Sequence, residues 1–216
     1  MALLNPTVGR LKGSGAKAPE RVAVRPRPGS RVLVLILIAA CALTKSVAPA
    51  GAQSELPTEY QIKAAFLYNF AKFVEWPADA FADPHAPIVL GIVGEDPFGN
   101  VLDKIVLGKT VNGRGLVIKR LKPGPDLRNC HILFLNSSEK KHLAPILESL
   151  QGSSVLTVGE TDRFAQSGGV INFIFEENKV RFEINSETAA RAGLKISSKL
   201  LALARIVANQ PNGGKN

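Results

Sequence analysis

The sequence predicts a three-layer α/β sandwich whose sheet is mostly parallel, with one antiparallel hairpin and helices on both faces. Three observations lead to this fold class. Apolar runs of strand length alternate with helical patterns along residues 58–207, as they do in βαβ units. Two of these runs, 87–93 and 130–135, are apolar on both faces, which is typical of central parallel strands. Two late strands are joined only by residues 176–178, and so short a link predicts a hairpin.

The first element is a helix over residues 58–76. Thr58 and Gln61 have the spacing of a capping box, which satisfies the backbone donors at a helix start. At the other end Trp76 precedes Pro77, and the residue before a proline disfavours helical geometry. Both boundaries therefore follow from local chemistry.

The later elements follow from the same rules. Pro97 suits the first turn of a helix that runs to residue 107, and Ser137 or Ser138 caps a helix through residue 150. A last helix is expected over 186–207, interrupted at Gly193. The remaining elements are a helical turn at 161–165 and strands at 87–93, 116–121, 130–135, 154–158, 170–175 and 179–185.

The first helix is apolar almost all round, whereas a helix on the outside of a sheet needs only one apolar stripe. Either it lies deep in the domain, or it offers a second face to another surface. Its aromatic side chains are the candidates for a partner or dimer interface, because aromatic residues are enriched where proteins bind one another. They are Phe66, Tyr68, Phe70, Phe73 and Trp76.

The N-terminal segment is typical of an export signal. Basic residues precede an uninterrupted apolar run over 32–43, which is shorter than the roughly 20 residues of a spanning helix. The small residues AGA at 50–52 match the pattern that signal peptidase reads. Residues 1–52 are therefore expected to be a signal peptide, and the mature protein is expected in the periplasm. The alternatives are a lipobox that ends at Cys41 and an uncleaved anchor.

The net charge of +9 belongs mostly to this leader. Residues 1–52 hold eight of the 27 basic residues and one of the 18 acidic residues, so the remainder is near neutral. A strongly basic domain would indicate a nucleic-acid partner, and this distribution argues against one. After the signal peptide we expect a linker at 53–57, one α/β domain over 58–208 and a disordered tail at 209–216.

Neither a metal site nor a catalytic site is expected. His85, His131 and His142 are far apart and share no ligand spacing with each other or with Cys130. The sequence has no G-x-S-x-G motif and no catalytic Cys/His signature, so we expect a binding protein without a cofactor rather than an enzyme. Cys130 is the one cysteine outside the leader; it opens an apolar strand and is expected in the core, without a disulfide.

A small-ligand pocket is the alternative to a protein partner. The loop after the first strand carries Glu95 and Asp96 at the edge where open α/β sheets bind ligands, although two carboxylates would repel phosphate. Arg181 and Glu183 share the polar face of a strand, and an arginine suits carboxylate or phosphate recognition. Lys199 completes this candidate pocket. A tight turn and a solvated strand face explain the same residues without any ligand.

Five ordered blocks carry a family resemblance: 60–77 (YQIKAAFLYNFAKFVEWP), 91–99 (GIVGEDPFG), 130–134 (CHILF), 168–173 (GGVINF) and 178–201 (NKVRFEIN, then GLKISSKLL). Together they resemble the YfiR family of periplasmic proteins over about residues 60–207. The resemblance implies a dimeric periplasmic repressor. Such a protein binds the periplasmic sensory part of an inner-membrane diguanylate cyclase, and so restrains cyclic di-GMP production and biofilm formation.

The resemblance also bears on redox control and on the membrane. Redox-sensitive members of the family carry paired cysteines, and with Cys130 alone a disulfide switch within one subunit is not expected here. Contact with the membrane is expected only through the cyclase partner, or through a lipid on Cys41.

Overall fold

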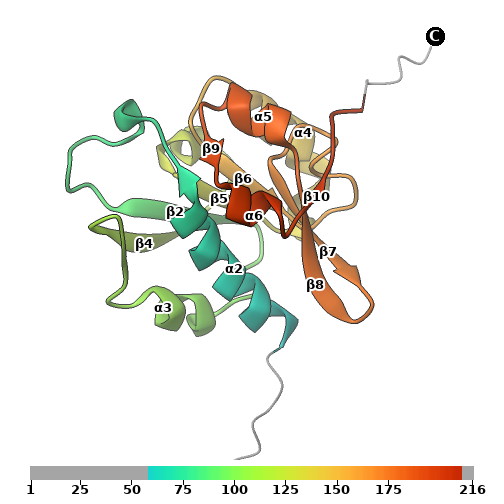
Figure 1. The fold of residues 1–216 in the computed structure, drawn as a ribbon, viewed down its shortest axis with the longest axis horizontal. Helices are drawn as coiled ribbons and strands as arrows, with labels where there is room; N and C mark the ends of the chain where they lie inside the picture. Colours follow the sequence, from blue (N-terminus) through green and yellow to red (C-terminus); the bar gives the residue numbers. More distant parts are fainter. Residues whose placement is uncertain (1–57, 211–216) are drawn as a thin grey trace, which may run out of the picture. The chain divides into compact units, whose positions relative to one another are not determined.

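The computed structural model describes residues 58–210. The expected signal peptide (1–52), the alternative lipobox ending at Cys41 and the linker (53–57) lie outside the described residues, as do positions 211–216 of the expected tail. The described residues form an eight-stranded sheet, a separate two-stranded sheet, and helices on both faces of the larger sheet (Figure 1). The predicted three-layer α/β sandwich is confirmed.

The larger sheet has the strand order β10-β8-β7-β6-β5-β2-β4-β3. Its strands are β2 (Ile88–Val93), β3 (Thr110–Val111), β4 (Arg114–Leu121), β5 (Ile132–Leu135), β6 (Leu156–Gly159), β7 (Ile171–Glu176), β8 (Lys179–Ile184) and β10 (Arg205–Ile206). The five neighbouring strands from β4 to β7 run parallel. β7 and β8 form the predicted antiparallel hairpin, β10 lies parallel to β8, and β3 adds an antiparallel edge strand beside β4.

The helices are α2 (Glu59–Phe73), α3 (Asn100–Val106), α4 (Leu143–Ser149), α5 (Ser186–Arg191) and α6 (Ser198–Leu201), with 3-10 helices η1 (Ala78–Ala80), η2 (Pro125–Asn129) and η3 (Ser137–His142). The predicted capping box of α2 is present, because Thr58 and Gln61 each bond the other's backbone N–H through a side-chain oxygen. Among residues 58–210, none of the helices has the length and apolar character needed to cross a membrane.

α2 ends at Phe73, three residues before the predicted boundary. Val74 is extended, and with Glu75 it forms the short strand β1 (Val74–Glu75). β1 pairs antiparallel with β9 (Lys195–Ile196), which lies far away in the sequence. The pairing partner, rather than the Trp-Pro step, therefore determines where the helix stops.

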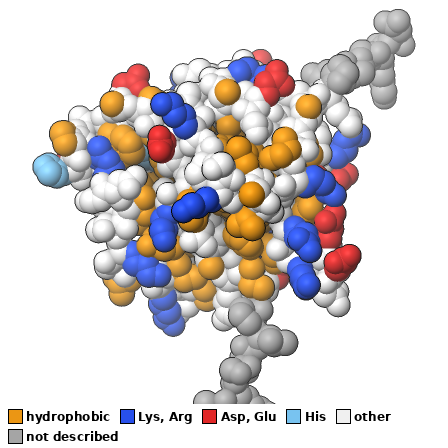
Figure 2. Space-filling model, in the orientation of Figure 1, with side chains coloured by type: hydrophobic (Ala, Val, Ile, Leu, Met, Phe, Trp, Pro, Cys, Tyr) orange, Lys and Arg blue, Asp and Glu red, His pale blue; other side chains and the backbone are white. Residues whose placement is uncertain are grey.

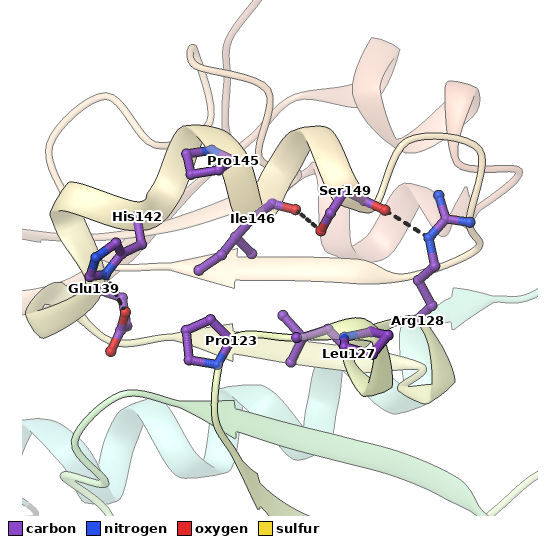
Figure 3. Close-up of a pocket in the computed structure, with 10 residues that line it drawn as sticks. Pro123, Leu127, Arg128, Glu139, His142, Pro145, Ile146 and Ser149 are labelled. Carbon is purple, nitrogen blue, oxygen red and sulfur yellow. Dashed lines mark hydrogen bonds and ion pairs between the residues drawn. The ribbon is translucent and has the colours of Figure 1, made fainter.

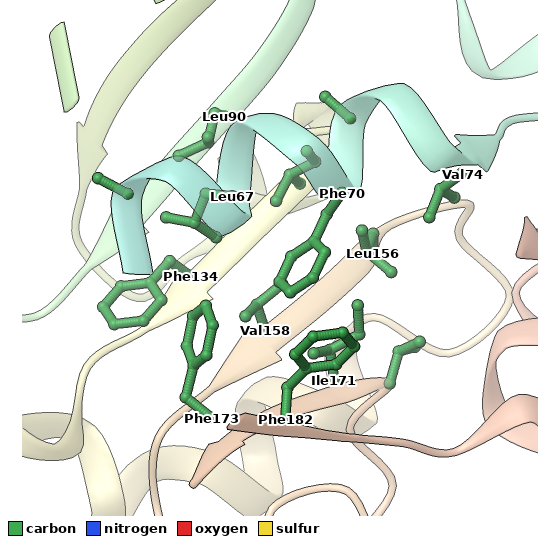
Figure 4. Packing of buried hydrophobic residues seen from close by; sticks show 14 of the residues in the cluster. Leu67, Phe70, Val74, Leu90, Phe134, Leu156, Val158, Ile171, Phe173 and Phe182 are labelled. Atoms are coloured by element: carbon green, nitrogen blue, oxygen red, sulfur yellow. The ribbon is translucent and has the colours of Figure 1, made fainter. Parts of the chain in front are cut away.

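Apolar side chains form a separate core on each face of the larger sheet. On one face α2 lies across the strands, and Leu67 and Phe70 point from it onto the sheet (Figure 4). On the other face Ile146 of α4 belongs to an apolar cluster with Leu133 and Phe164. Burying a large apolar side chain contributes about 1.5–3 kcal/mol, so both helical layers are held firmly on the sheet.

The C-terminal region is not the single interrupted helix that the sequence predicted over 186–207. It forms α5, β9, α6 and β10 in turn. Gly193 adopts a left-handed φ of 71°, which ends the helical path after α5, and Ser197 caps the separate helix α6. Both short strands pair with distant strands, and these tertiary hydrogen bonds override the local helix propensity.

The start of α3 also differs from the prediction. Pro97 lies in a turn before the helix, which begins at Asn100. Asp96 Oδ1 accepts hydrogen bonds from the backbone N–H groups of Phe98 and Gly99. This side chain competes with helical hydrogen bonding, as aspartate does in turns, and delays the helix by three residues.

Three further details differ from the prediction: the residue that caps η3, the conformation of residues 161–165, and the first residue of β5. Asn136, rather than Ser137 or Ser138, caps η3, because its Oδ1 accepts a hydrogen bond from the N–H of Ser138. Residues 161–165 form a non-helical turn, whereas a turn of helix was expected. β5 begins at Ile132 rather than at residue 130. The strand assignments themselves are confirmed, and only their ends shift.

Candidate functional site

The aromatic residues predicted as an interface on α2 do not form a single exposed face. Phe70 is 0% exposed, and its ring centroid lies 5.7 Å from that of Phe173 and 5.2 Å from that of Phe182. It has no surface to offer a partner, so the structure corrects this prediction and places Phe70 in the core. The reason is that α2 lies directly on β7 and β8, which cover its central aromatic ring.

Tyr68 and Trp76 are half-buried and held by neighbours within the domain. The Lys109 ammonium lies 4.7 Å from the centroid of the Tyr68 ring, and Trp76 Nε1 donates a hydrogen bond of 3.1 Å to the backbone oxygen of His131. Tyr68 lies about 160° around the helix from Phe66. The five predicted aromatics are therefore divided among different environments.

Phe66 and Phe73 are seven residues apart and therefore lie on the same side of α2. The backbone oxygen of Phe73 accepts a hydrogen bond from the N–H of Ser197 at the start of α6. Half-buried and exposed apolar residues are found on this side of α2 and in the neighbouring α6 region. We call them the α2–α6 surface, which consists of Ile62, Phe66, Phe73, Leu201 and Leu203.

The α2–α6 surface has the character of a binding patch. Leu203 is 69% exposed. Figure 2 shows hydrophobic side chains gathered at the centre of this face of the molecule, over α2 and α6, with Lys and Arg side chains around them. An apolar patch with a polar rim is typical of a protein-binding site.

The ligand pocket predicted from Glu95, Asp96, Arg181, Glu183 and Lys199 does not assemble. The first two residues follow β2, whereas Arg181 and Glu183 lie on β8, and β5, β6 and β7 stand between these strands. Four strand spacings amount to about 19 Å. Lys199 lies on α6, on the α2 side of the sheet. The prediction is wrong because alternation along a strand shows which residues share a face, but not the order of the strands in the sheet.

Asp96 has a structural role instead. Its carboxylate accepts a hydrogen bond of 2.8 Å from Arg120 Nε, and Asp103 accepts one of 2.7 Å from Arg120 Nη2. Hydrogen bonding to Asp103 and Asp96 raises the pKa of Arg120, and the same contact lowers the pKa of Asp103. The backbone N–H of Glu95 donates to Ser138 Oγ over 3.1 Å. These bonds tie the loop after β2 to β4, α3 and η3.

Glu183 and Arg181, predicted as one polar lining, have opposite environments. Glu183 is buried, and its Oε1 accepts hydrogen bonds of 3.0 and 2.7 Å from Nε and Nη2 of Arg205. Arg205 Nη1 also donates to Glu176 over 2.7 Å, and the hydrogen bonds with Glu183 raise the pKa of Arg205. Arg181 is exposed. Sequence reasoning missed Arg205 because it placed residues 186–207 in a helix.

A buried ion pair fills the carboxyl edge of the parallel strands, where open α/β sheets bind ligands. Lys63 Nζ lies 2.7 Å from Glu160 Oε2, and Asn136 Nδ2 donates to Glu160 Oε1 over 2.9 Å. Burial lowers the pKa of Lys63, but hydrogen bonds with Glu160 and Glu59 outweigh burial and raise it. Burial, and then the charge of Glu160, raise the pKa of Tyr60. Sequence reasoning missed this cluster because Lys63 resembles a scattered surface residue on an apolar helix.

An apolar cavity of about 630 Å³ lies between η2 and α4 (Figure 3). Pro145 and Ile146 of α4 face Pro123 and Leu127 across it. Charged groups on the lining are already engaged with protein groups: Arg128 Nε donates to the backbone oxygen of Ser149 over 2.7 Å. A mostly apolar hollow with few polar groups suits a small molecule. No motif in the sequence marked it.

Cys130 and His131 act as core groups. Burial raises the pKa of Cys130 to about 11, so its thiol stays protonated and unreactive at neutral pH. His131 Nδ1 accepts a hydrogen bond of 3.0 Å from the N–H of Val89, and Nε2 lies 3.1 Å from the backbone oxygen of Ala80. Burial lowers the pKa of His131, in keeping with a neutral ring. In the part of the chain that the structure describes, no three His, Cys, Asp or Glu side chains are grouped to hold a metal ion.

Comparison with known families decides the identity of this fold. The YfiR/HmsC-like family matches residues 60–205, which is nearly all of the described domain. The chain belongs to the YfiR/HmsC-like family. The resemblance carried by the five sequence blocks is thereby confirmed.

Two solved structures are distantly similar to part of this chain. The ABC domain in complex with L-Trp from Streptococcus pneumoniae is 10% identical, with a TM-score of 0.42 and coverage of 55% of each chain. A conserved domain protein from Vibrio cholerae is 12% identical, with a TM-score of 0.45, covering 69% of this chain and 60% of that one. The match spans less than two thirds of either solved chain.

Proposed function

We propose that this protein is a periplasmic regulatory binding protein that represses an inner-membrane diguanylate cyclase, and so restrains cyclic di-GMP production and biofilm formation. The family match over residues 60–205 is the observation that carries the proposal. The match includes both cores and nearly the whole sheet, so it concerns the complete domain. The role expected of this family is regulation by binding, rather than catalysis.

The α2–α6 surface supports a protein partner. Phe66 rests on Phe182 with a centroid separation of 5.3 Å, so its ring is already immobilised and loses little entropy on binding. Leu203 adds exposed apolar area to the same α2–α6 surface. We place the contact with the periplasmic part of the cyclase on Phe66, Phe73 and Leu203. The homodimer implied by the family is a further part of the proposal.

Export to the periplasm is also part of the proposal. The basic segment, the apolar run at 32–43 and the AGA sequence at 50–52 support it. N-terminal analysis of the protein recovered from cells tests it, with Gln53 as the expected first residue. A lipid-modified Cys41 would replace the soluble form by an anchored one, and an unprocessed Met1 would contradict the proposal.

Co-expression tests the regulatory role. The chain is expressed with the membrane diguanylate cyclases of its host, one at a time, and cyclic di-GMP is measured. We expect its level to fall with one cyclase, which is then retained when the tagged chain is captured from cross-linked envelopes. Leu203→Glu should abolish both effects, because it places a charge on the apolar surface. Lys140→Glu, an exposed change on η3, should abolish neither. If no cyclase is repressed or retained, the proposal fails.

A small-ligand sensor is the second candidate function, and the cavity beside α4 favours it. A ligand at about 100 times its dissociation constant would stabilise the fold by about 2.7 kcal/mol. Gly124 lines the cavity, and a Cβ there meets only the backbone oxygen of Lys122 at 4.0 Å. Gly124→Leu should therefore fill the cavity and remove any thermal stabilisation by small apolar compounds. Equal stabilisation of the variant and the parent would contradict a ligand site here.

A further inference from the structure

The β7–β8 hairpin extends beyond the strands beside it (Figure 1). β6 is in register only with Ile171 and Asn172 of β7, and β10 only with Glu183 and Ile184 of β8. Among the described residues, the distal part of the hairpin has no partner strand on either edge. Unpaired strand edges of this kind are templates for another strand.

The geometry of the hairpin fixes which backbone groups face outward. Glu177 and Asn178 both have left-handed φ values, 51° and 59°, which is typical of a two-residue type I′ turn. The residues that flank such a turn form a hydrogen-bonded pair, and pairs alternate from there. Val180 and Phe182 therefore fall at the pairs that do not bond across the hairpin. Their N–H and C=O groups point to the outer edge of β8. The pairing of Arg205 with Glu183 engages the C=O of Phe182, so the N–H of Phe182 and both groups of Val180 are left without a partner strand.

A groove of about 680 Å³ runs along this outer edge. Ile174, Arg181 and Phe182 line it on the hairpin side, and Leu203 lines it on the segment that leads into β10. The groove thus brings together outward backbone groups, an exposed apolar side chain and a guanidinium. It also adjoins the α2–α6 surface, because Leu203 belongs to both.

Some charged side chains of the groove form ion pairs and others do not. Arg205 pairs with both Glu176 and Glu183, so these three charges are engaged with one another. Arg181 forms no ion pair within residues 58–210. It lies opposite Ile174 in the register and is exposed. Arg181 is therefore a guanidinium without an ion-pair partner, and carboxylates are its preferred partners. The carboxylate of Glu177, which also lines the groove, likewise forms no ion pair among the described residues.

We propose that this groove binds an extended segment of a partner protein, which adds to β8 as a further strand, with a carboxylate against Arg181 and an apolar side chain against Leu203. The proposal rests on the proposed function for the identity of the partner. A second copy of this chain is a poorer occupant. Pairing β8 with its own copy about a two-fold axis would bring Lys179 and Arg181 of both copies together, and like charges on paired strands repel.

Peptide binding tests the groove separately from repression. The probe is a short, blocked peptide of alternating valine and glutamate, and its twin has lysine in place of glutamate. Both are titrated into the ¹⁵N-labelled processed protein. We expect the acidic peptide to shift the amide signals of Val180, Arg181 and Phe182 and to slow hydrogen exchange at Val180. The acidic peptide should bind at least about tenfold more tightly than the basic one.

Two variants decide whether Arg181 confers the preference. Arg181→Glu should reverse the order of the two peptides, and Arg181→Gln should make them equal; Lys140→Glu has the same charge change on η3 and should leave the order intact. Equal binding of both peptides by the parent, or signal shifts at the α4 cavity instead of β8, would overturn the groove proposal. Concentration-dependent self-pairing through β8 would also overturn it. If the peptide results hold while no cyclase is repressed, the proposed function fails and the groove stands.

Discussion

The parallel part of the sheet and the β7–β8 hairpin differ in how their strand edges and charged side chains are paired. From β4 to β6 the strands are paired on both edges, and most side chains of β2, β5 and β6 are buried. The charged groups at their carboxyl edge, Lys63 and Glu160, are paired with each other. In the hairpin the edges are open, Phe175 is 58% exposed and Arg181 has no acidic partner among the described residues.

The difference separates a region that stabilises the fold from a region that is available for binding. The edge at which doubly wound sheets bind ligands is filled here by protein groups, so that region acts as scaffold. The unpaired strand edges and the unpaired guanidinium of Arg181 lie on the β7–β8 hairpin, and the exposed Leu203 lies on the segment from α6 to β10. Substitutions in the two regions should therefore separate stability from binding.

The largest loss of stability is expected in the core under α2. Phe70→Ala should lower the free energy of unfolding by about 3–5 kcal/mol, because it leaves a cavity between α2 and the hairpin. Phe175→Ala removes the same group from an exposed site and should change it by less than about 0.5 kcal/mol. Urea denaturation of both variants measures the contrast. Similar losses at the two positions would contradict the division into scaffold and binding region.

A comparable loss is expected from breaking the ion pair at the carboxyl edge. Lys63→Met leaves the Glu160 carboxylate buried without its partner, which costs about 3–5 kcal/mol. Replacing both residues by apolar ones should recover most of that loss, because no charge then remains buried. The same denaturation assay tests this double-mutant comparison. A double variant no more stable than Lys63→Met would show that the pair has another role.

The scaffold could largely be predicted from the sequence, because its signals are local. The apolar runs at 87–93 and 130–135 identified central strands, Thr58 and Gln61 identified a helix start, and the short link at 176–178 identified the hairpin. Each depends on periodicity, capping or turn chemistry within a few residues. The structure moved these elements only at their ends.

The candidate site was harder to predict because its parts come from separate strands. The order of β2 and β8 in the sheet separated the expected pocket, and no local pattern encodes that order. The short strands β9 and β10 could not be predicted, because two residues show no periodicity and their partners are distant in the sequence. Arg205, whose side chain holds Glu183 and Glu176, was hidden by the same error.

A smaller loss is expected when the hairpin is released from β10. Arg205→Ala removes the hydrogen bonds to the buried Glu183, which should cost about 1–3 kcal/mol. Arg205→Lys should cost less, because an ammonium retains the charge without the two-pronged contact. Hydrogen exchange of the β8 amides measures the local effect, and exchange in β2 should be unchanged. Uniform loss of protection across both strands would indicate global rather than local opening.

The smallest effect concerns alkaline pH. The pKa of Lys63 is raised in the folded state, so its contribution to stability is complete below its unfolded pKa of about 10.4 and is lost as pH rises through the folded pKa. The pKa of Tyr60 is also raised, and an unfolded tyrosine ionises first, near pH 10. Both groups therefore lower the free energy of unfolding above about pH 10. Tyr60→Phe should reduce this alkaline loss, since it removes one of the two titrating groups. Urea denaturation at about pH 8 and at about pH 11 measures it, and equal stability at both would contradict the environments assigned to Lys63 and Tyr60.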